Sequence, residues 1–217
     1  MSATRRRSAA SVFVVALAAG ACGDNASPAG PSGPSLGFFV TSATSTTGNL
    51  GGLAGADATC QRLAAAVGHG SRTWRAYLSV ERENARDRIG NGPWFNANQV
   101  LVANNLAELH SRAGDASVFV DERGQRINGQ WTGSPTPNQH DILTGSNADG
   151  TVAAGLTCAD WTSEAITVRG QVGHSDGFGP NQSTAGSLAS WNSAHTTQSC
   201  ANTAPGGGAG RFYCFAR

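Results

Sequence analysis

Two cysteine-bearing segments, at the start and the end of the globular region, constrain the fold of this chain most. Residues 51–68 place apolar side chains three or four positions apart, which predicts an amphipathic helix with Cys60 on its buried face. Gly68 can adopt the left-handed conformation that ends such a helix. The chain closes with an alternating aromatic segment, residues 211–217, which predicts a strand carrying Cys214. We therefore expect Cys60 and Cys214 to form a pair.

The amino-terminal residues have the pattern of an export signal. Three consecutive arginines precede an apolar run and a small-residue cleavage site, so residues 1–21 are assigned to a signal peptide. Cleavage before Cys22 resembles bacterial lipoprotein processing, although Ala19 stands where that motif usually has leucine. Cys22 is thus the predicted lipid attachment site, and an ordinary secretory signal is the alternative.

A tether rich in proline, glycine and serine follows over residues 22–35, and the folded domain is expected over residues 36–217. The aspartate that favours inner-membrane retention is displaced to position 24, which favours anchoring in the outer membrane or display on the cell surface. A periplasmic or secreted protein is the alternative. We expect contact with a membrane only through the lipid anchor.

The charge balance argues against a nucleic-acid partner. The chain has 15 basic residues, all of them arginine, and removal of the three in the signal peptide leaves 12 against 14 acidic residues. The mature protein is therefore slightly acidic, and a basic surface of the kind that binds nucleic acid is not expected.

Between the two cysteine-bearing segments the pattern predicts short elements separated by long loops, the composition of an α+β domain. The expected strands and helical turns cover residues 36–42, 73–79, 100–102, 105–110 and 117–121. Residues 134–156 and 169–190 are expected to be long ordered loops because they are rich in Gly, Asn, Ser, Thr, Pro and Asp.

Three polar or aromatic segments are expected at the surface. Residues 81–88 alternate in charge and are typical of a solvated face. The carboxylate pair Asp121 and Glu122 falls in a predicted exposed turn, and Trp94, next to Pro93, is the tryptophan expected to be most exposed.

Four cysteines remain after the export segment, an even number that predicts two disulfides with three possible connectivities. A nested arrangement, Cys60 with Cys214 and Cys158 with Cys200, would join the helix to the last strand and tie down the loop-rich region. Zinc binding by the four cysteines is the weaker alternative, because the short spacings of zinc knuckles are missing.

Five stretches together carry a resemblance to a known family: residues 55–60, 73–79, 131–133, 156–164 and 212–215. Their order and the four cysteines resemble the endostatin-like branch of the C-type lectin fold, including uncharacterised bacterial lipoprotein domains. The resemblance covers Phe38 to Phe215. It implies a small antiparallel sheet, one main helix, long disulfide-stapled loops and the nested disulfide pairing. Endostatin's zinc site is not implied, because the tether contains no histidine.

The same resemblance suggests where a ligand would bind. Sugar-binding members hold calcium with Glu-Pro-Asn-like and Trp-Asn-Asp tripeptides, and this chain has Thr136-Pro137-Asn138 and Trp191-Asn192-Ser193, each without its carboxylate. Neighbouring aspartates could replace the missing charges. The candidate ligand-binding residues are Asn138, Asp141, Asn147, Asp149, Trp191 and Asn192. The alternative is that the Asn and Asp side chains satisfy backbone amides in turns.

No catalytic residues are assigned, and we expect the protein not to be an enzyme. The five histidines are His69, His110, His140, His174 and His195. Their spacing along the chain is not that of a metal-binding motif, so no metal site is assigned. Calcium is the one cofactor considered. Hydrolase and phosphate-loop motifs are missing. A secreted hydrolase would require a deep pocket that collects His140, His174 and an aspartate.

The sequence therefore predicts an exported, lipid-anchored, non-catalytic binding module. Its expected ligand is a glycan, a matrix component or another protein, bound by the loops of residues 134–190, because loops on a rigid scaffold commonly carry function. A calcium-dependent lectin and a secreted hydrolase are the alternatives.

Overall fold

The computed structural model describes Met1, residues 33–133 and residues 135–217. The predicted signal peptide beyond Met1, the predicted lipid attachment site Cys22 and most of the tether lie outside the described residues. Within the described ranges, no helix combines the length and apolar character needed to cross a bilayer.

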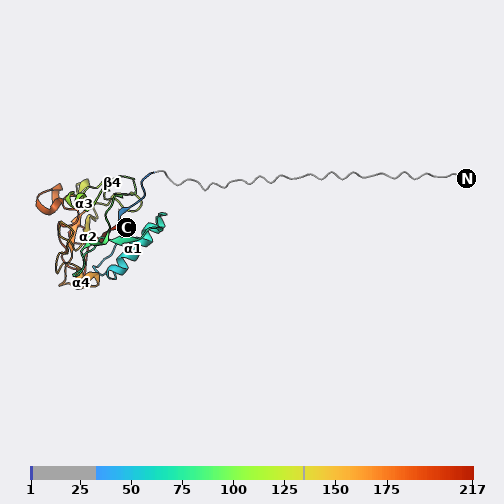
Figure 1. Cartoon of the computed structure of the whole chain (residues 1–217). Helices are drawn as coiled ribbons and strands as arrows, with labels where there is room; N and C mark the ends of the chain where they lie inside the picture. Colours follow the sequence, from blue (N-terminus) through green and yellow to red (C-terminus); the bar gives the residue numbers. More distant parts are fainter. Residues whose placement is uncertain (2–32, 134) are drawn as a thin grey trace. The chain divides into compact units, whose positions relative to one another are not determined.

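The domain from Gly33 onward is a mixture of short strands and few helices (Figure 1). The strands are β1 (Phe38–Val40), β2 (Trp74–Ala76), β3 (Trp94–Phe95), β4 (Leu101–Ala103), β5 (Asp141–Leu143), β6 (Gln171–His174), β7 (His195–Thr196) and β8 (Gly208–Ala216). The α-helices are α1 (Gly52–Ala66), α2 (Ala85–Arg88), α3 (Leu106–Ser111) and α4 (Cys158–Trp161). Three 3-10 turns complete the set: η1 (Gln130–Thr132), η2 (Pro180–Gln182) and η3 (Gly186–Ala189).

Strand β8 organises the main sheet, whose order is β1-β8-β5-β6-β7 with β2 also paired to β8. Its carboxyl-terminal half pairs antiparallel with β1 and β2, so Phe215 lies opposite Phe38 and Cys214 lies opposite Ala76. Its earlier residues pair in parallel with β5. The prediction of a closing aromatic strand is confirmed. This strand connects β1 and β2 with β5, β6 and β7 in one sheet.

Helix α1, the longest helix among the described residues, lies along one side of the domain (Figure 1). It buries Ala56, Cys60, Leu63 and Ala64, as the apolar spacing predicts. Gly68 follows the helix with φ of 85°, the left-handed conformation expected at its end.

Both disulfides have the nested pairing, Cys60 with Cys214 and Cys158 with Cys200. The second bond begins at α4, whose four residues have positive φ angles. This unusual left-handed turn is held by its side chains: the Thr157 hydroxyl accepts a hydrogen bond from the Asp160 amide at 3.2 Å, and Trp161 Nε1 donates to the Ser79 carbonyl at 2.8 Å.

An aromatic cluster fills the space beside the sheet, and Trp94 belongs to it. The expectation that Trp94 is exposed is wrong, because its side chain is 1% exposed and its ring packs edge-on against Phe215 at 5.2 Å. Trp94 lies in β3, which pairs with β4. Its side chain packs in the same buried cluster as Val102 and Ala103 of β4. Phe119 and Tyr213 complete the cluster around Trp191.

The mixed-charge segment 81–88 is only partly a solvated face. Arg88, in α2, is buried and binds both oxygens of Asp57 on α1 at 2.8 and 2.9 Å. Arg75 on β2 binds the same carboxylate at 2.7 Å. Asp57 therefore joins α1, β2 and α2 through charge-assisted hydrogen bonds, which the sequence pattern did not reveal.

The carboxylate pair Asp121 and Glu122 is also buried, contrary to the sequence-based expectation. The Glu122 carboxylate accepts hydrogen bonds from the backbone amide and the hydroxyl of Ser42. Asp121 Oδ1 accepts the backbone amides of Arg123 and Gln125 and so closes the turn. The turn itself is confirmed, but its carboxylates face protein donors instead of solvent.

The two regions expected to be loops contain strands β5 and β6, which pair antiparallel. Both strands are only three or four residues long and are buried throughout. A short strand buried on both faces shows no alternation of polar and apolar side chains, which is why the sequence pattern missed them.

A candidate metal centre

Three neighbouring strands bring histidine and aspartate side chains to one face of the sheet. Asp141, the first residue of β5, lies opposite His174, the last residue of β6. His195, the first residue of β7, lies opposite Val172, two residues before His174 and therefore on the same face of β6. His140 precedes β5, and its ring stacks on His174 with a centroid distance of 4.4 Å and an interplanar angle of 7°.

The Nε2 atoms of the three histidines converge on a single carboxylate oxygen, Asp141 Oδ1. The distances are 3.3 Å from His140, 3.5 Å from His174 and 3.5 Å from His195. The side chains of His140, His174 and Asp141 are at most 4% exposed, whereas that of His195 is 36% exposed. The cluster is therefore buried on three sides and reaches solvent beside His195.

The other ring nitrogen of each histidine faces an acceptor, which fixes the tautomer of the neutral ring. His140 Nδ1 lies 2.8 Å from Asp176 Oδ1, His174 Nδ1 lies 2.8 Å from the Leu188 carbonyl, and His195 Nδ1 lies 3.0 Å from the Thr196 carbonyl. A carboxylate or a carbonyl can only accept, so each Nδ1 must donate its proton. Each neutral histidine then has its unprotonated nitrogen, Nε2, directed toward Asp141.

Lone-pair atoms of three buried side chains, His140, Asp141 and His174, consequently lie within 4.8 Å of one another, and His195 Nε2 faces the same Asp141 oxygen. Asp141 Oδ1 and His174 Nε2 are buried and find no hydrogen-bond donor among the described residues. Buried polar atoms are nearly always satisfied, so this arrangement requires a proton or a cation between the four groups.

The environment shifts the pKa values of three groups in the cluster. Burial lowers the pKa of His174 below its usual value, because it outweighs the attraction of Asp141 for a proton on the ring. Contact with the Asp141 carboxylate raises the pKa of His195. Burial alone would raise the pKa of Asp176, but the hydrogen bond from His140 and the backbone amides of Phe178 and Trp131 together lower it.

The donor set suits a divalent transition-metal ion. Imidazole nitrogens and a carboxylate bind zinc at about 2.0–2.2 Å, and ligand atoms at that distance in a tetrahedron lie about 3.3 Å apart. The ligand atoms of His140, Asp141 and His174 lie within 4.8 Å of one another, and the separations of 3.3 and 3.5 Å from Asp141 Oδ1 to His140 Nε2 and His174 Nε2 are close to such tetrahedral edges. His195 Nε2 lies 3.5 Å from the same oxygen but outside this group of three. The Nδ1 contacts, above all that of His140 with Asp176, are of the kind that orients metal-bound histidines.

The sequence points to Asp141 as a candidate ligand-binding residue, but it does not group the histidines with it. His140, His174 and His195 are too far apart along the chain to form a ligand motif, and only strand pairing brings them together. The hydrolase alternative did require His140, His174 and an aspartate to converge, and the structure does place them together.

The other candidate calcium ligands lie in a separate network around Asn192. Its side-chain amide donates to the Tyr77 hydroxyl at 3.0 Å and to the carbonyls of Asn147 and Ala148 at 3.0 and 3.2 Å. The Asp149 carboxylate accepts the amide and hydroxyl of Thr151. These side chains thus satisfy turn and core groups, and their hydrogen bonds do not direct them toward Asp141.

Of the last two candidate ligand-binding residues, Trp191 lies in the core and Asn138 lies beside the histidine cluster. Trp191 is 1% exposed and stacks on Phe119, so its ring belongs to the core and offers no open surface to a sugar. Asn138 lies beside His140, because a Cβ built on Gly207 would be 2.6 Å from Asn138 Nδ2 and 3.0 Å from His140 Cδ2.

Comparison with known families gives one match. Residues 43–177, more than half of the chain, match the model of a family described as "Protein of unknown function (DUF1554)". The chain belongs to this family. None of the curated proteins compared with this DUF1554 member matches it. The matched range contains His140, Asp141, His174 and Asp176, whereas His195 lies after it.

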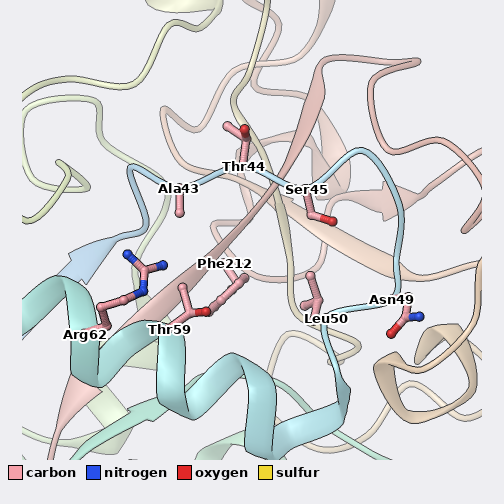
Figure 2. A pocket seen from close by; sticks show the side chains of 9 residues that line it. Ala43, Thr44, Ser45, Asn49, Leu50, Thr59, Arg62 and Phe212 are labelled. Carbon is pink, nitrogen blue, oxygen red and sulfur yellow. The ribbon is translucent and has the colours of Figure 1, made fainter.

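This DUF1554 protein also has a groove away from the histidine cluster, between α1 and the loop that follows β1 (Figure 2). Thr59 and Arg62 of α1 lie across the groove from Ala43 and Ser45 of the loop, with Phe212 of β8 between them. The groove holds about 500 Å³ of empty space, part of it open to solvent. Its lining residues lie outside the segment 134–190, where sequence analysis expected the binding face.

Proposed function

We propose that this DUF1554 protein is an exported binding module that holds a divalent transition-metal ion through His140, His174, His195 and Asp141. The observation that carries the proposal is the convergence of three histidine Nε2 atoms on Asp141 Oδ1, which receives no hydrogen bond from any described residue. A bound cation would replace four mutually repelling lone pairs with four favourable contacts.

The chemistry of the ligands favours zinc and its neighbours in the transition series over calcium. Calcium takes six to eight oxygen ligands, whereas this centre offers three nitrogens and one carboxylate. Asp176, which accepts the Nδ1 proton of His140, supplies a second negative charge close by. Asp141 and Asp176 together would balance the charge of a divalent ion, which limits the cost of burying it.

The decisive experiment measures zinc affinity of the metal-stripped mature protein by competition with a chromogenic chelator. We expect one zinc ion per chain, no competition by calcium, and a loss of affinity on the order of 100-fold or more in His174→Ala, because a ligand contributes at least as much as its outer partners. His69→Ala is the matched control, since His69 lies after α1 and takes no part in the cluster.

Equal zinc affinity in His174→Ala and His69→Ala would reject the metal centre. In that case a proton shared between Asp141 and His195 would satisfy the cluster, which agrees with the raised pKa of His195. A melting temperature that rises with zinc concentration in the native protein, and not in His174→Ala, would support the centre independently.

The scaffold and the location belong to the same proposal. We propose a C-type-lectin-like, endostatin-like scaffold, supported by the nested disulfides and by one main helix linked to the last strand. We propose export with a lipid anchor on Cys22, toward the outer membrane or the cell surface, supported by the amino-terminal sequence. Metabolic labelling with a fatty acid in the native chain and in Cys22→Ala tests the anchor, because only the native chain should incorporate label.

A hydrolase is the second candidate function, favoured by the convergence of His140, His174 and Asp141. A non-catalytic module that recognises a glycan, matrix component or protein remains our first proposal, because the sequence contains none of the common hydrolase motifs. Its test is a glycan and matrix-protein array probed with the zinc-loaded and the metal-stripped protein.

A further inference from the structure

Asn138 has an acceptor atom that nothing among the described residues satisfies. Its Oδ1 is buried and receives no hydrogen bond from them. A buried amide oxygen without a donor costs on the order of 1–3 kcal/mol, so such an atom points to a donor that binds there. Asn138 and the His140 ring both come within about 3 Å of the position that a Cβ on Gly207 would occupy. The Asn138 amide group therefore lies next to the His140 ring of the proposed metal centre.

Glycines cover the solvent side of the centre at the same place. A Cβ on Gly206 would lie 3.3 Å from Asp141 Oδ2 and 3.8 Å from His195 Cε1, so the backbone of this residue passes directly over the ligands. Gly206 is exposed and its φ is +94°, while Gly207 has a φ of +122°. Two residues without side chains thus lie between the Asp141 carboxylate and solvent, next to the partly exposed His195 ring.

The balance of charge selects the kind of group that fits between Asn138 and the centre. Asp141 and Asp176 already match the two charges of a divalent ion, so an additional neutral ligand leaves the balance unchanged. The group must also donate a hydrogen bond to Asn138 Oδ1. Water meets both requirements, since it binds metal ions through oxygen and keeps two protons to donate.

We propose, on the basis of the metal-binding function argued above, that the centre has a fifth, exchangeable position on the side of Gly206 and Gly207. Water occupies this position at rest and donates a hydrogen bond to Asn138 Oδ1. Small ligands from solution that carry a lone pair replace the water there, and those without a proton, such as azide, do so without the hydrogen bond to Asn138 Oδ1. Asn138 is accordingly a positioning residue of the centre and not one of its direct ligands.

The test uses the mature protein loaded with Co²⁺, whose visible spectrum reports coordination number, and titrates it with azide. We expect the weak visible bands of five-coordinate cobalt and a saturable spectral change with azide. In Asn138→Ala the cobalt affinity should stay within about threefold, while azide should bind about fivefold more tightly, because the competing water has lost one hydrogen bond. Asn128→Ala, an exposed asparagine, is the matched control and should change neither value.

The outcomes separate this inference from the metal-binding proposal. Intense tetrahedral bands that azide does not alter would show a closed four-ligand centre and would overturn the fifth position alone. A cobalt affinity that falls about 100-fold or more in Asn138→Ala, the loss expected for a direct ligand, with Asn128→Ala unchanged, would make Asn138 a direct ligand and would also overturn the inference. If the native protein binds no cobalt, or if His174→Ala binds cobalt as tightly as the native protein does, both proposals are rejected.

Discussion

His140 Nδ1 lies 2.8 Å from Asp176 Oδ1, and this contact determines which nitrogen of His140 faces the other histidines. Asp176 is itself held by the backbone amides of Trp131 and Phe178 at 3.2 and 3.1 Å. Loop backbone thus fixes the carboxylate, the carboxylate fixes the ring, and the ring directs Nε2 toward Asp141. A centre arranged in this way is preorganised before any ion enters.

Replacing Asp176 with asparagine should weaken zinc binding without removing a ligand. The new side chain could turn its amide group toward His140 and would no longer favour a proton on Nδ1, so we expect a roughly 10- to 100-fold loss of affinity. Competition with a chelator measures the loss. Asp87 is an exposed carboxylate that takes no part in the histidine cluster, so Asp87→Asn should bind zinc like the native protein. Unchanged affinity in Asp176→Asn would show that this contact is not part of the centre.

Gly206→Ala should crowd the metal centre, and Gly155→Ala provides the matched control. Both glycines have positive φ, at +94° and +75°, so each alanine should cost on the order of 1 kcal/mol of conformational strain. A Cβ on Gly155 meets no atom within 4 Å, whereas one on Gly206 approaches Asp141 Oδ2 at 3.3 Å. Thermal melts should therefore show similar destabilisation, but zinc affinity should fall only in Gly206→Ala.

The two disulfides should contribute unequally to the free energy of unfolding. Their sequence separations are 154 residues for Cys60–Cys214 and 42 residues for Cys158–Cys200. The loop-entropy relation then gives about 5 and about 4 kcal/mol for the two bonds. Urea unfolding of the two double-alanine variants measures both losses. Equal stability of either variant and the native protein would contradict the expectation.

The parts of this fold that the sequence predicts well are those in which one local pattern decides the structure. Helix α1 has an uninterrupted apolar stripe and a glycine after its end, and α3 is capped by Asn105, whose side chain accepts the Glu108 amide at 3.0 Å. The closing strand β8 alternates aromatic residues. Each of these signals lies within a short stretch of neighbouring residues, so it can be read without knowing the rest of the fold.

The histidine cluster could not be predicted in the same way, because no local pattern produces it. Asp141 and His174 become neighbours only through the pairing of β5 with β6, two strands that the sequence pattern represents as loops. The sequence points to Asp141 for a different reason, its place among the candidate calcium ligands. The buried Arg88 shows the same limitation, since its partner Asp57 lies on another element.

Asp57 should be important for stability because one carboxylate serves three donors. It accepts hydrogen bonds from Arg75, Arg88 and the Ala76 amide, and its side chain is 12% exposed. Asp57→Ala would leave the buried Arg88 without this partner, which should cost about 3 kcal/mol of unfolding free energy, measured by urea unfolding. Glu83→Gln is the control: Glu83 also binds Arg88, but its side chain is 47% exposed, so its loss should cost less than about 1 kcal/mol.

Asn192→Ala distinguishes a structural role of the Trp191-Asn192-Ser193 tripeptide from a calcium-binding role. The Asn192 amide donates to the buried Tyr77 hydroxyl and to two loop carbonyls, so its removal breaks these hydrogen bonds and should lower the unfolding free energy by about 2 kcal/mol. Calcium should raise the melting temperature of neither the native protein nor the variant. A calcium-dependent rise in the native protein that Asn192→Ala abolishes would instead establish the lectin-type site. Asn202→Ala, in an exposed turn, should behave like the native protein under both conditions.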